Sequence, residues 1–334
     1  MLGRLVIGLL VLVGLIALIA AGGYFALKRA DIPYETLANR YENAASRYVD
    51  LPGGVRMHYR DQGVQSADAP TLLLIHGFSS SLHAWEPWVE QLGGDYRMVT
   101  LDLPGHGLTR APAGYQVSIE AYRDIVAEFV RAQGLQRFAL AGSSMGGNVS
   151  WEYALAHPDQ VQALILIGAS GWPPPETESP NEPLIFKLLR NPLLGPLLRD
   201  LDSSRLIRQG LEASFPNNPQ LVTDEMVSRY ADLARAPGHR DILLQMTLGF
   251  SQRNYATAER LAALQMPVLI LHGVEDNIVP YEHGQLFDEA IPQAEMVTYE
   301  TVGHVPHEEI PQDSALATHE FLYRVFERPA LATP

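Results

Sequence analysis

Short, continuous apolar runs alternate with helix-length segments along most of this 334-residue chain. Runs of this kind are typical of strands buried on both faces, whereas strands with one wet face alternate apolar and polar residues. Strands that alternate with helices form a parallel sheet with helices on both faces. The runs predicted as strands are 71–77, 96–102, 138–144, 161–170, 266–273 and 294–300, and the helices predicted between the first four are 84–92, 118–133 and 145–157.

An edge hairpin and a helical insertion complete the predicted fold. Residues 46–52 and 55–63 are strand candidates joined by the turn-forming Pro52-Gly53-Gly54, which predicts a hairpin. The alternation fails in the interval 172–256, where apolar segments such as 184–194 have a helical pattern without strands. We therefore predict an α/β fold with a mostly parallel sheet of about eight strands and a helical cap, whose apolar residues could line a pocket for an acyl chain.

The N-terminal segment is apolar enough to cross a membrane. Leu5–Leu27 contains 23 residues without a charge, and a helix of this length spans a hydrocarbon core of roughly 30 Å. A cleaved signal peptide is the alternative, because Ala20-Ala21-Gly22 resembles a cleavage site. The apolar run, however, continues beyond the usual h-region of about 7 to 15 residues. We predict an uncleaved, single-pass anchor in the cell (inner) membrane.

The side of the membrane is less constrained by the charges that flank this segment. Lys28 and Arg29 follow it and by charge alone favour a cytoplasmic domain. A very short basic tail before a long apolar run is, however, also typical of a signal anchor, so we expect the periplasmic side. The predicted parts of the chain are an anchor (1–29), a stalk (30–46), a sheet domain in two pieces (47–171 and 257–334) and the cap (172–256).

Charge and cysteine content limit the partners. The net charge of −14 would repel phosphate backbones, so we expect no nucleic acid partner. The chain has no cysteine, which excludes a disulfide framework, a thiolate nucleophile and a cysteine zinc site. His304 and His307 are not spaced as H-E-x-x-H, so we expect no metal. The oligomeric state stays open.

The stretch Gly142-Ser143-Ser144-Met145-Gly146 has the spacing G-x-S-x-G with Ser144 at its centre. It lies where a predicted strand ends and a predicted helix begins, and a nucleophile on such a sharp turn needs neighbours without a Cβ. Ser143 has alanine two positions before it, so the spacing selects Ser144. A helix-capping serine is the alternative, and a phosphate-binding loop is excluded because it requires a lysine.

Two further residues follow predicted strands in the order that a serine hydrolase requires. Asp276 comes just after the strand at 266–273 and His304 just after the strand at 294–300. The carboxyl ends of parallel strands meet at one edge of the sheet, so we predict Ser144 as nucleophile, His304 as general base and Asp276 as the acid that orients it. Glu275 is the rival acid, which we interpret as a solvated loop residue, and His307 is the rival base, which we interpret as a rim residue.

The same spacing predicts donors for an oxyanion. The residue after the nucleophile, Met145, would supply one backbone N–H. The loop after the strand at 71–77 would supply the second, from Phe78. We interpret His76 as a residue held in that turn by backbone contacts.

These residues lie in stretches that together resemble the α/β hydrolase superfamily, from roughly Arg47 to Glu327. The resemblance implies the α/β hydrolase fold, a serine hydrolase activity and no cofactor. The matching stretches are HGFSSSLHAWEPWV (76–89), DLPGHGLT (102–109), GSSMGG (142–147), GVEDNIVP (273–280) and GHVPHEEIP (303–311).

The resemblance also orders the possible substrates. Serine rather than aspartate at position 144 argues against haloalkane dehalogenases and epoxide hydrolases. The N-terminal span together with GSSMGG is similar to membrane-anchored monoacylglycerol lipases and related bacterial esterases, so we predict a serine carboxylic-ester hydrolase acting on a small acyl ester or lipid. Carbon–carbon hydrolases of ring-cleavage products are the alternative, although they carry an aromatic residue where this chain has Val305. A membrane-anchored binding protein without activity is the alternative of another class.

Overall fold

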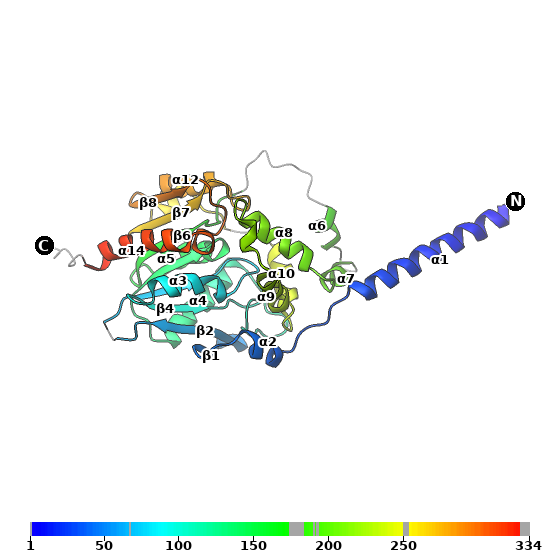
Figure 1. Cartoon of the computed structure of the whole chain (residues 1–334), viewed down its shortest axis with the longest axis horizontal. Coiled ribbons are helices and arrows are strands. Elements are labelled where there is room, and N and C mark those ends of the chain that lie inside the picture. Colours follow the sequence, from blue (N-terminus) through cyan, green and yellow to red (C-terminus); the bar gives the residue numbers. More distant parts are fainter. Residues whose placement is uncertain are drawn as a thin grey trace.

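Figure 1 shows a sheet flanked by helices, with a group of further helices at one end and an N-terminal helix that projects from the body. The computed structural model describes residues 2–66, 68–173, 184–189, 191, 194–249 and 254–327.

The eight-stranded sheet has the order β1-β2-β4-β3-β5-β6-β7-β8. The β1–β2 and β2–β4 pairs are antiparallel, and the remaining pairs are parallel. The predicted edge hairpin and mostly parallel sheet are therefore confirmed. The strands are β1 (Ser46–Leu51), β2 (Val55–Gly63), β3 (Thr71–Ile75), β4 (Arg97–Leu101), β5 (Phe138–Ser143), β6 (Val161–Ile167), β7 (Val268–Gly273) and β8 (Ala294–Tyr299).

Helices cover both faces of the sheet, and alternate strand residues serve the two cores. Leu73 and Ile75 of β3 pack into the cluster that contains residues of α4 and α5. Leu72 and Leu74 of the same strand pack into the cluster with α3 and α14. Because both faces of the central strands β3 to β7 are buried, these strands are apolar without alternation, as the sequence predicted. The helices of the sheet domain are α3 (Glu86–Leu92), α4 (Ile119–Ala132), α5 (Met145–Ala156), α11 (Ala258–Leu261), α12 (Tyr281–Ala290), α13 (Pro306–Glu309) and α14 (Pro311–Glu327).

Between β6 and β7 the described residues form helices and no strand. These helices lie together at one end of the sheet domain in Figure 1. Leu211, Phe215, Val222 and Val227 form a small apolar core of their own. The helices are α6 (Leu184–Leu189), α7 (Gly195–Arg199), α8 (Ser204–Ser214), α9 (Asp224–Ala234) and α10 (His239–Leu248).

The N-terminal segment consists of α1 (Leu2–Leu27) and α2 (Tyr34–Tyr41). The segment that we expected to be a stalk, 30–46, is partly folded against the body, because Ile32 and Leu37 are buried in a cluster with Leu108. Among the residues open to description, no helix is both long and apolar enough to cross a membrane.

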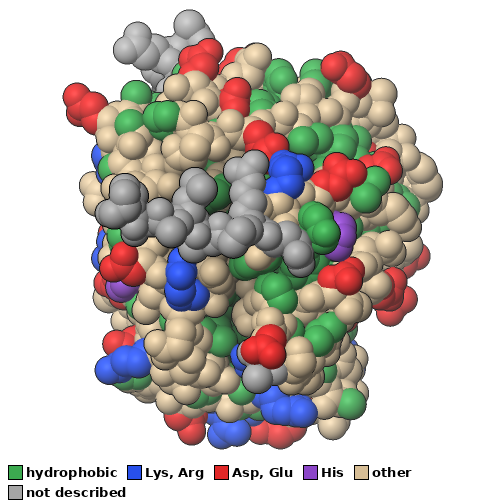
Figure 2. All heavy atoms as spheres, turned by 90° about the vertical axis from the view of Figure 1, so that its left-hand side faces the viewer, with side chains coloured by type: hydrophobic (Ala, Val, Ile, Leu, Met, Phe, Trp, Pro, Cys, Tyr) green, Lys and Arg blue, Asp and Glu red, His purple; other side chains and the backbone are tan. Residues whose placement is uncertain are grey.

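Acidic and basic side chains are interspersed on the face drawn in Figure 2. Lys and Arg side chains lie scattered there among Asp and Glu rather than in one continuous field. A phosphate backbone would find no basic track on this face.

Candidate active site

Ser144 stands on the sharp turn between β5 and α5. Its φ of 55° and ψ of −118° lie outside the regions that serine normally occupies. A Cβ on Gly142 would lie 2.2 Å from the carbonyl oxygen of Gly146, and a Cβ on Gly146 would lie 2.2 Å from that of Ile75. Both glycines are therefore required by close backbone approach, which is the steric reason for the G-x-S-x-G spacing.

Asp276 and His304 meet at the carboxyl edge of the sheet. Asp276 follows β7 and His304 follows β8, and Asp276 Oδ2 lies 2.7 Å from His304 Nδ1. The other carboxylate oxygen of Asp276 accepts hydrogen bonds from the backbone N–H groups of Ile278 and Val279, both at 2.8 Å. These contacts fix the carboxylate of Asp276. It binds the His304 ring through Nδ1, so Nε2 is the nitrogen that can accept a proton from Ser144.

The surroundings of Asp276 keep its carboxylate charged. Burial raises its pKa, but the nearby His304 and His272 rings and their hydrogen bonds outweigh that effect and hold the pKa well below its usual value. His272, at the end of β7, places Nε2 3.3 Å from Asp276 Oδ2. A charged Asp276 at neutral pH can stabilise an imidazolium on His304.

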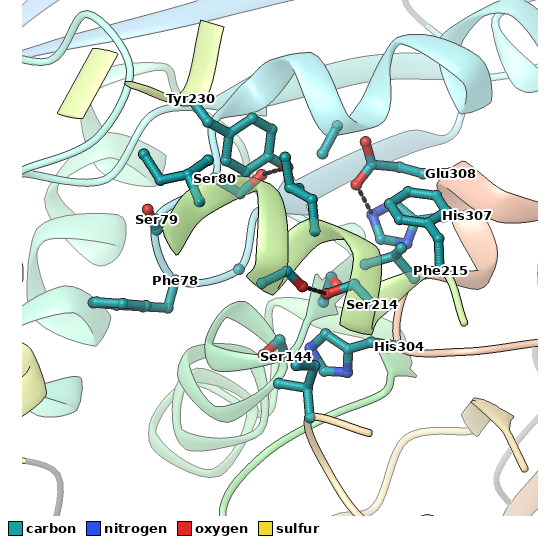
Figure 3. A pocket seen from close by; sticks show the side chains of 18 of the residues that line it. Phe78, Ser79, Ser80, Ser144, Ser214, Phe215, Tyr230, His304, His307 and Glu308 are labelled. Carbon is teal, nitrogen blue, oxygen red and sulfur yellow. Dashed lines mark hydrogen bonds and ion pairs between the residues drawn. The ribbon is translucent and has the colours of Figure 1, made fainter. Parts of the chain in front are cut away.

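Ser144 and His304 line the same cavity and lie side by side in Figure 3. No hydrogen bond joins Ser144 Oγ to His304 among the described contacts. Bonds between a nucleophile and its base are often long without substrate and tighten when substrate binds. The arrangement therefore suits proton transfer from Ser144 to His304.

The loop after β3 lies against the nucleophile. A Cβ on Gly77 would lie 3.2 Å from the Cβ of Ser144, so the next residue, Phe78, begins beside the reacting atom. His76 is buried, with Nδ1 2.7 Å from the Gly77 carbonyl oxygen and Nε2 accepting from the Leu103 N–H at 3.0 Å. The interpretation of His76 as a residue that holds the turn is confirmed. The structure thus places Phe78 and Met145 on the two segments that flank Ser144.

The cavity at Ser144 has a volume of about 360 Å³. Of its lining residues, Phe78, Leu206 and Ile278 are exposed, which places them on its open side, whereas Phe215 and His307 are buried. Among the described lining residues there is no Lys or Arg. Its apolar lining residues are Phe78, Ala84, Leu206, Ile207, Leu211, Phe215, Ile278 and Val305.

The structure separates the two rival residues. Glu275 is exposed and accepts a hydrogen bond from Asn217 at 2.8 Å, so its interpretation as a loop residue is confirmed. The interpretation of His307 as a rim residue was wrong: its side chain is 1% exposed, with its ring centroid 4.5 Å from that of Trp85. The helical turn α13 carries it inward, and burial lowers its pKa to about 3.

Sequence reasoning missed three polar residues at the site, His272, Tyr230 and Glu308. His272 had a signal, because it ends a predicted strand four residues before Asp276. Tyr230 lies on the cap helix α9, and nothing in the sequence places that helix over Ser144. Within the part of the chain that the structure describes, no group of three His, Cys, Asp or Glu could hold a metal ion.

Comparisons with known proteins agree with this geometry. The family described as "alpha/beta hydrolase fold" matches residues 70–311. The chain is 27% identical over 261 residues to 2-hydroxymuconate semialdehyde hydrolase of Pseudomonas sp. (strain CF600), covering 76% of this chain and 86% of the relative. It is 27% identical over 288 residues to Lipase 1 of Psychrobacter immobilis, covering 80% of each. A crystal structure titled as a membrane phospholipase A, a bacterial virulence factor, has 28% identity and a TM-score of 0.70, and covers 96% of this chain and 99% of its own.

Proposed function

The chain belongs to the α/β hydrolase family and is a hydrolase, and from this premise we propose that it cleaves carboxylic esters through an acyl-enzyme on Ser144. The observation that carries the proposal is the cavity beside Ser144, whose described lining is mostly apolar and includes no Lys or Arg. An acyl chain gains about 0.8 kcal/mol for each methylene that it buries in such a cavity. A substrate that carries carboxylates would find no cation there.

The proposed reaction has two steps. Ser144 Oγ attacks the ester carbonyl while His304 accepts its proton, and the backbone N–H groups of Phe78 and Met145 stabilise the oxyanion. The intermediate collapses, the C–O bond to the alcohol breaks, and His304 returns the proton to that alcohol. Water then attacks the acyl-enzyme while His304 accepts its proton. The bond from the acyl carbon to Ser144 Oγ breaks, His304 returns the proton to Ser144 Oγ, and the carboxylic acid leaves.

Cleavage of a carbon–carbon bond is the second candidate, because one relative is named as a hydrolase of 2-hydroxymuconate semialdehyde. The name of that substrate denotes a carboxylate, and the only acidic side chain among the described lining residues, Glu308, would repel it when ionised. Val305 follows His304 where the carbon–carbon hydrolases carry an aromatic residue. Both observations favour the ester.

Ser144→Ala and Ser143→Ala test the proposal as a matched pair. The wild type should hydrolyse p-nitrophenyl butyrate and octanoate and become labelled by a fluorophosphonate. Ser144→Ala should lose both properties, with kcat lower by on the order of 10⁶-fold, whereas Ser143→Ala should keep them. Labelling that persists in Ser144→Ala, or turnover of 2-hydroxy-6-oxo-dienoates without turnover of esters, would sink the assignment.

We also propose that α1 anchors the chain in the cell membrane with the catalytic domain on the periplasmic side. Two observations support an anchor: the 23 uncharged residues Leu5–Leu27 and the projection of the helix that contains them from the body in Figure 1. No helix among the described residues by itself meets the length and apolarity of a span, so the proposal rests on the sequence and on this projection. The match of 96% of this chain to a structure titled as a membrane phospholipase A agrees with it. Protease added to spheroplasts should digest a periplasmic domain, and a protected domain would place it in the cytoplasm.

A further inference from the structure

Glu308 is a carboxyl group in the cavity for which the proposed reaction has no use. Its side chain is 8% exposed, and its contact in the structure is His307 Nε2, 3.9 Å from Oε1. No hydrogen bond to this carboxyl occurs among the described residues. A buried carboxyl without a partner is costly, so this group is available for a ligand in the cavity.

Two hydroxyl groups from different elements accompany Glu308. Tyr230 OH of α9 and Ser80 Oγ of the loop after β3 lie 3.1 Å apart, and both residues line the cavity with Glu308. Figure 3 shows Tyr230, Ser80 and Glu308 on one side of the cavity and Ser144 with His304 on the other. We name Ser80, Tyr230 and Glu308 the polar end of the cavity.

The two ends of the cavity suit the two halves of an ester. The open side is apolar, formed by Phe78, Leu206 and Ile278, which are 36%, 65% and 46% exposed, so an acyl chain of any length can leave the cavity there. The polar end lies beside the buried Phe215 and His307, so we expect a short group there. That group must hydrogen bond, because it meets a carboxyl and two hydroxyls.

On the basis of the proposed ester hydrolysis, we infer that Ser80, Tyr230 and Glu308 bind the hydroxyl groups of a short, uncharged alcohol, and that Glu308 selects polyol esters over alkyl esters and over esters with an anionic alcohol. A hydroxyl of the alcohol donates to Glu308, and the hydroxyls of Tyr230 and Ser80 can each donate or accept. A carboxylate or phosphate in the same place would face the Glu308 carboxylate, and the described lining residues include no Lys or Arg to offset the repulsion.

The charges around Glu308 support this selection. Burial raises the pKa of Glu308 to about 7, with Arg229 of α9 lowering it and Glu86 of α3 raising it further. Glu86 pairs with Arg60 at 2.7 Å, and His307 is kept uncharged by burial. The exclusion of anionic alcohols should therefore strengthen as the pH rises through about 7.

Three octanoate esters of similar size test the inference: 1-monooctanoylglycerol, propyl octanoate and the octanoyl ester of glycolate. We expect the wild type to prefer the glycerol ester to the propyl ester in kcat/KM. In Glu308→Met this preference should fall by on the order of tenfold, the size expected for a lost hydrogen bond to a charged group, with a smaller change in the kcat/KM of the propyl ester than in that of the glycerol ester. Tyr230→Phe should reduce the preference in the same direction.

The glycolate ester tests the charge. The ratio of its kcat/KM to that of the propyl ester should fall between pH 6 and pH 8 in the wild type and stay flat in Glu308→Gln, because the ratio cancels the titration of groups shared by both reactions. Equal kcat/KM for all three esters in the wild type, or an equal loss on all of them in Glu308→Met, overturns the polar end and leaves ester hydrolysis standing. No turnover of any ester by the wild type overturns both.

Discussion

Ser144 keeps a backbone conformation that costs roughly 1–3 kcal/mol relative to an ordinary one, because its surroundings fix it from several sides. Its N–H donates to the Ile167 carbonyl oxygen at 2.9 Å, and its own carbonyl oxygen accepts from Asn148 and Ser170 at 3.2 and 3.1 Å. The reacting hydroxyl is therefore positioned by the ends of β5, β6 and α5 rather than by its own preference. A rigid nucleophile of this kind loses little entropy when substrate arrives.

Asp276→Asn should cripple turnover with little effect on folding. The amide oxygen can still accept from Ile278 and Val279, but the amide NH₂ would donate to His304 Nδ1 and leave the proton on Nε2, where it cannot accept from Ser144. Loss of this tautomer lowers kcat by about 10⁴-fold in triads of this kind. Glu275→Gln is the matched control and should be nearly silent, because Glu275 is exposed. Steady-state kinetics and thermal melts of both variants test this prediction. Loss of turnover in Glu275→Gln with normal turnover in Asp276→Asn would make Glu275 the acid.

Among the secondary-structure elements, the sequence pattern predicted the strands that are buried on both faces. It missed the helix α2, which forms by packing against the rest of the protein. The runs that became β3 to β7 were visible because both faces of each strand meet a core, whereas the edge strand β8 is only partly buried. The helix α2 was missed because its sequence, YETLANRY, is mostly polar and Leu37 is its buried residue. The helix α2 is stabilised by its contact with the body of the protein, and the sequence of α2 alone carries no information about that contact.

The glycines of two helices should respond in opposite directions to a methyl group. Gly146 begins α5 against β3, where a Cβ would lie 2.2 Å from the Ile75 carbonyl oxygen, whereas Gly210 of α8 has nothing within 4 Å of that position. Gly146→Ala should lower the Tm by roughly 2 °C or more, since overpacking against backbone costs about 1–3 kcal/mol. Gly210→Ala should leave the Tm unchanged or raise it, because alanine favours helix by about 1 kcal/mol. Similar melting curves for the two variants would contradict the close approach.

For the molecule as a whole, the sequence predicted that Ser144, Asp276 and His304 lie at one edge of the sheet, but it did not predict which residues line the cavity beside them. Those three residues follow predicted strands, and parallel strands bring their carboxyl ends to one edge whatever their other contacts. Tyr230 belongs to the cap, so its place depends on how α9 docks over that edge. Of the apolar residues of 184–194 that we expected to line a pocket, Leu188, Leu189 and Leu194 do not line the cavity at Ser144. The side chains of 184–186 and 193 lie outside the description. The helix α8 supplies lining residues, which are Leu206, Ile207 and Leu211.

Buried histidines make the fold sensitive to acid. Burial lowers the pKa values of His76, His106, His239 and His307 below the usual 6.5. Each group binds more protons in the unfolded chain, so its contribution to stability is complete above about pH 6.5 and is lost as the pH falls, by about 1.4 kcal/mol per pH unit and group. His83, whose pKa burial lowers to about 4, adds a fifth group in the same sense, whereas the raised pKa of Glu308 acts in the opposite sense as a single group.

Thermal melts between pH 7.5 and 5 should therefore show a Tm that falls with pH. His307→Phe keeps a ring against Trp85 and removes one titrating group, so its Tm should fall less steeply. If Tm falls with pH as steeply in His307→Phe as in the wild type, His307 does not contribute to the acid sensitivity. A wild-type Tm that rises on acidification would contradict the predicted destabilisation by the buried histidines.

Deletion of residues 1–28 tests the proposed N-terminal anchor. Charged contacts fix the end of α1 to the cap: Lys28 lies 3.7 Å from Asp200 and Arg29 lies 2.9 Å from Asp202. Arg240 also pairs with Asp31 at 2.6 Å, a contact that the truncated chain retains. The cap should therefore stay docked, and the truncated protein should leave the membrane fraction with a kcat/KM for p-nitrophenyl butyrate within about threefold of the full-length enzyme in detergent.

The full-length protein supplies the control for this deletion. It should stay in the membrane fraction through a wash at high salt, because apolar burial of a helix does not depend on ionic strength, whereas attachment through surface charges is screened. N-terminal sequencing distinguishes an anchor from a signal peptide. An N-terminus that includes residues 1–5 indicates an uncleaved anchor, whereas one that begins near Gly23 indicates a cleaved signal peptide. Full-length protein in the soluble fraction would contradict the anchor directly, since a span of 23 uncharged residues cannot stay exposed to water without aggregation or burial.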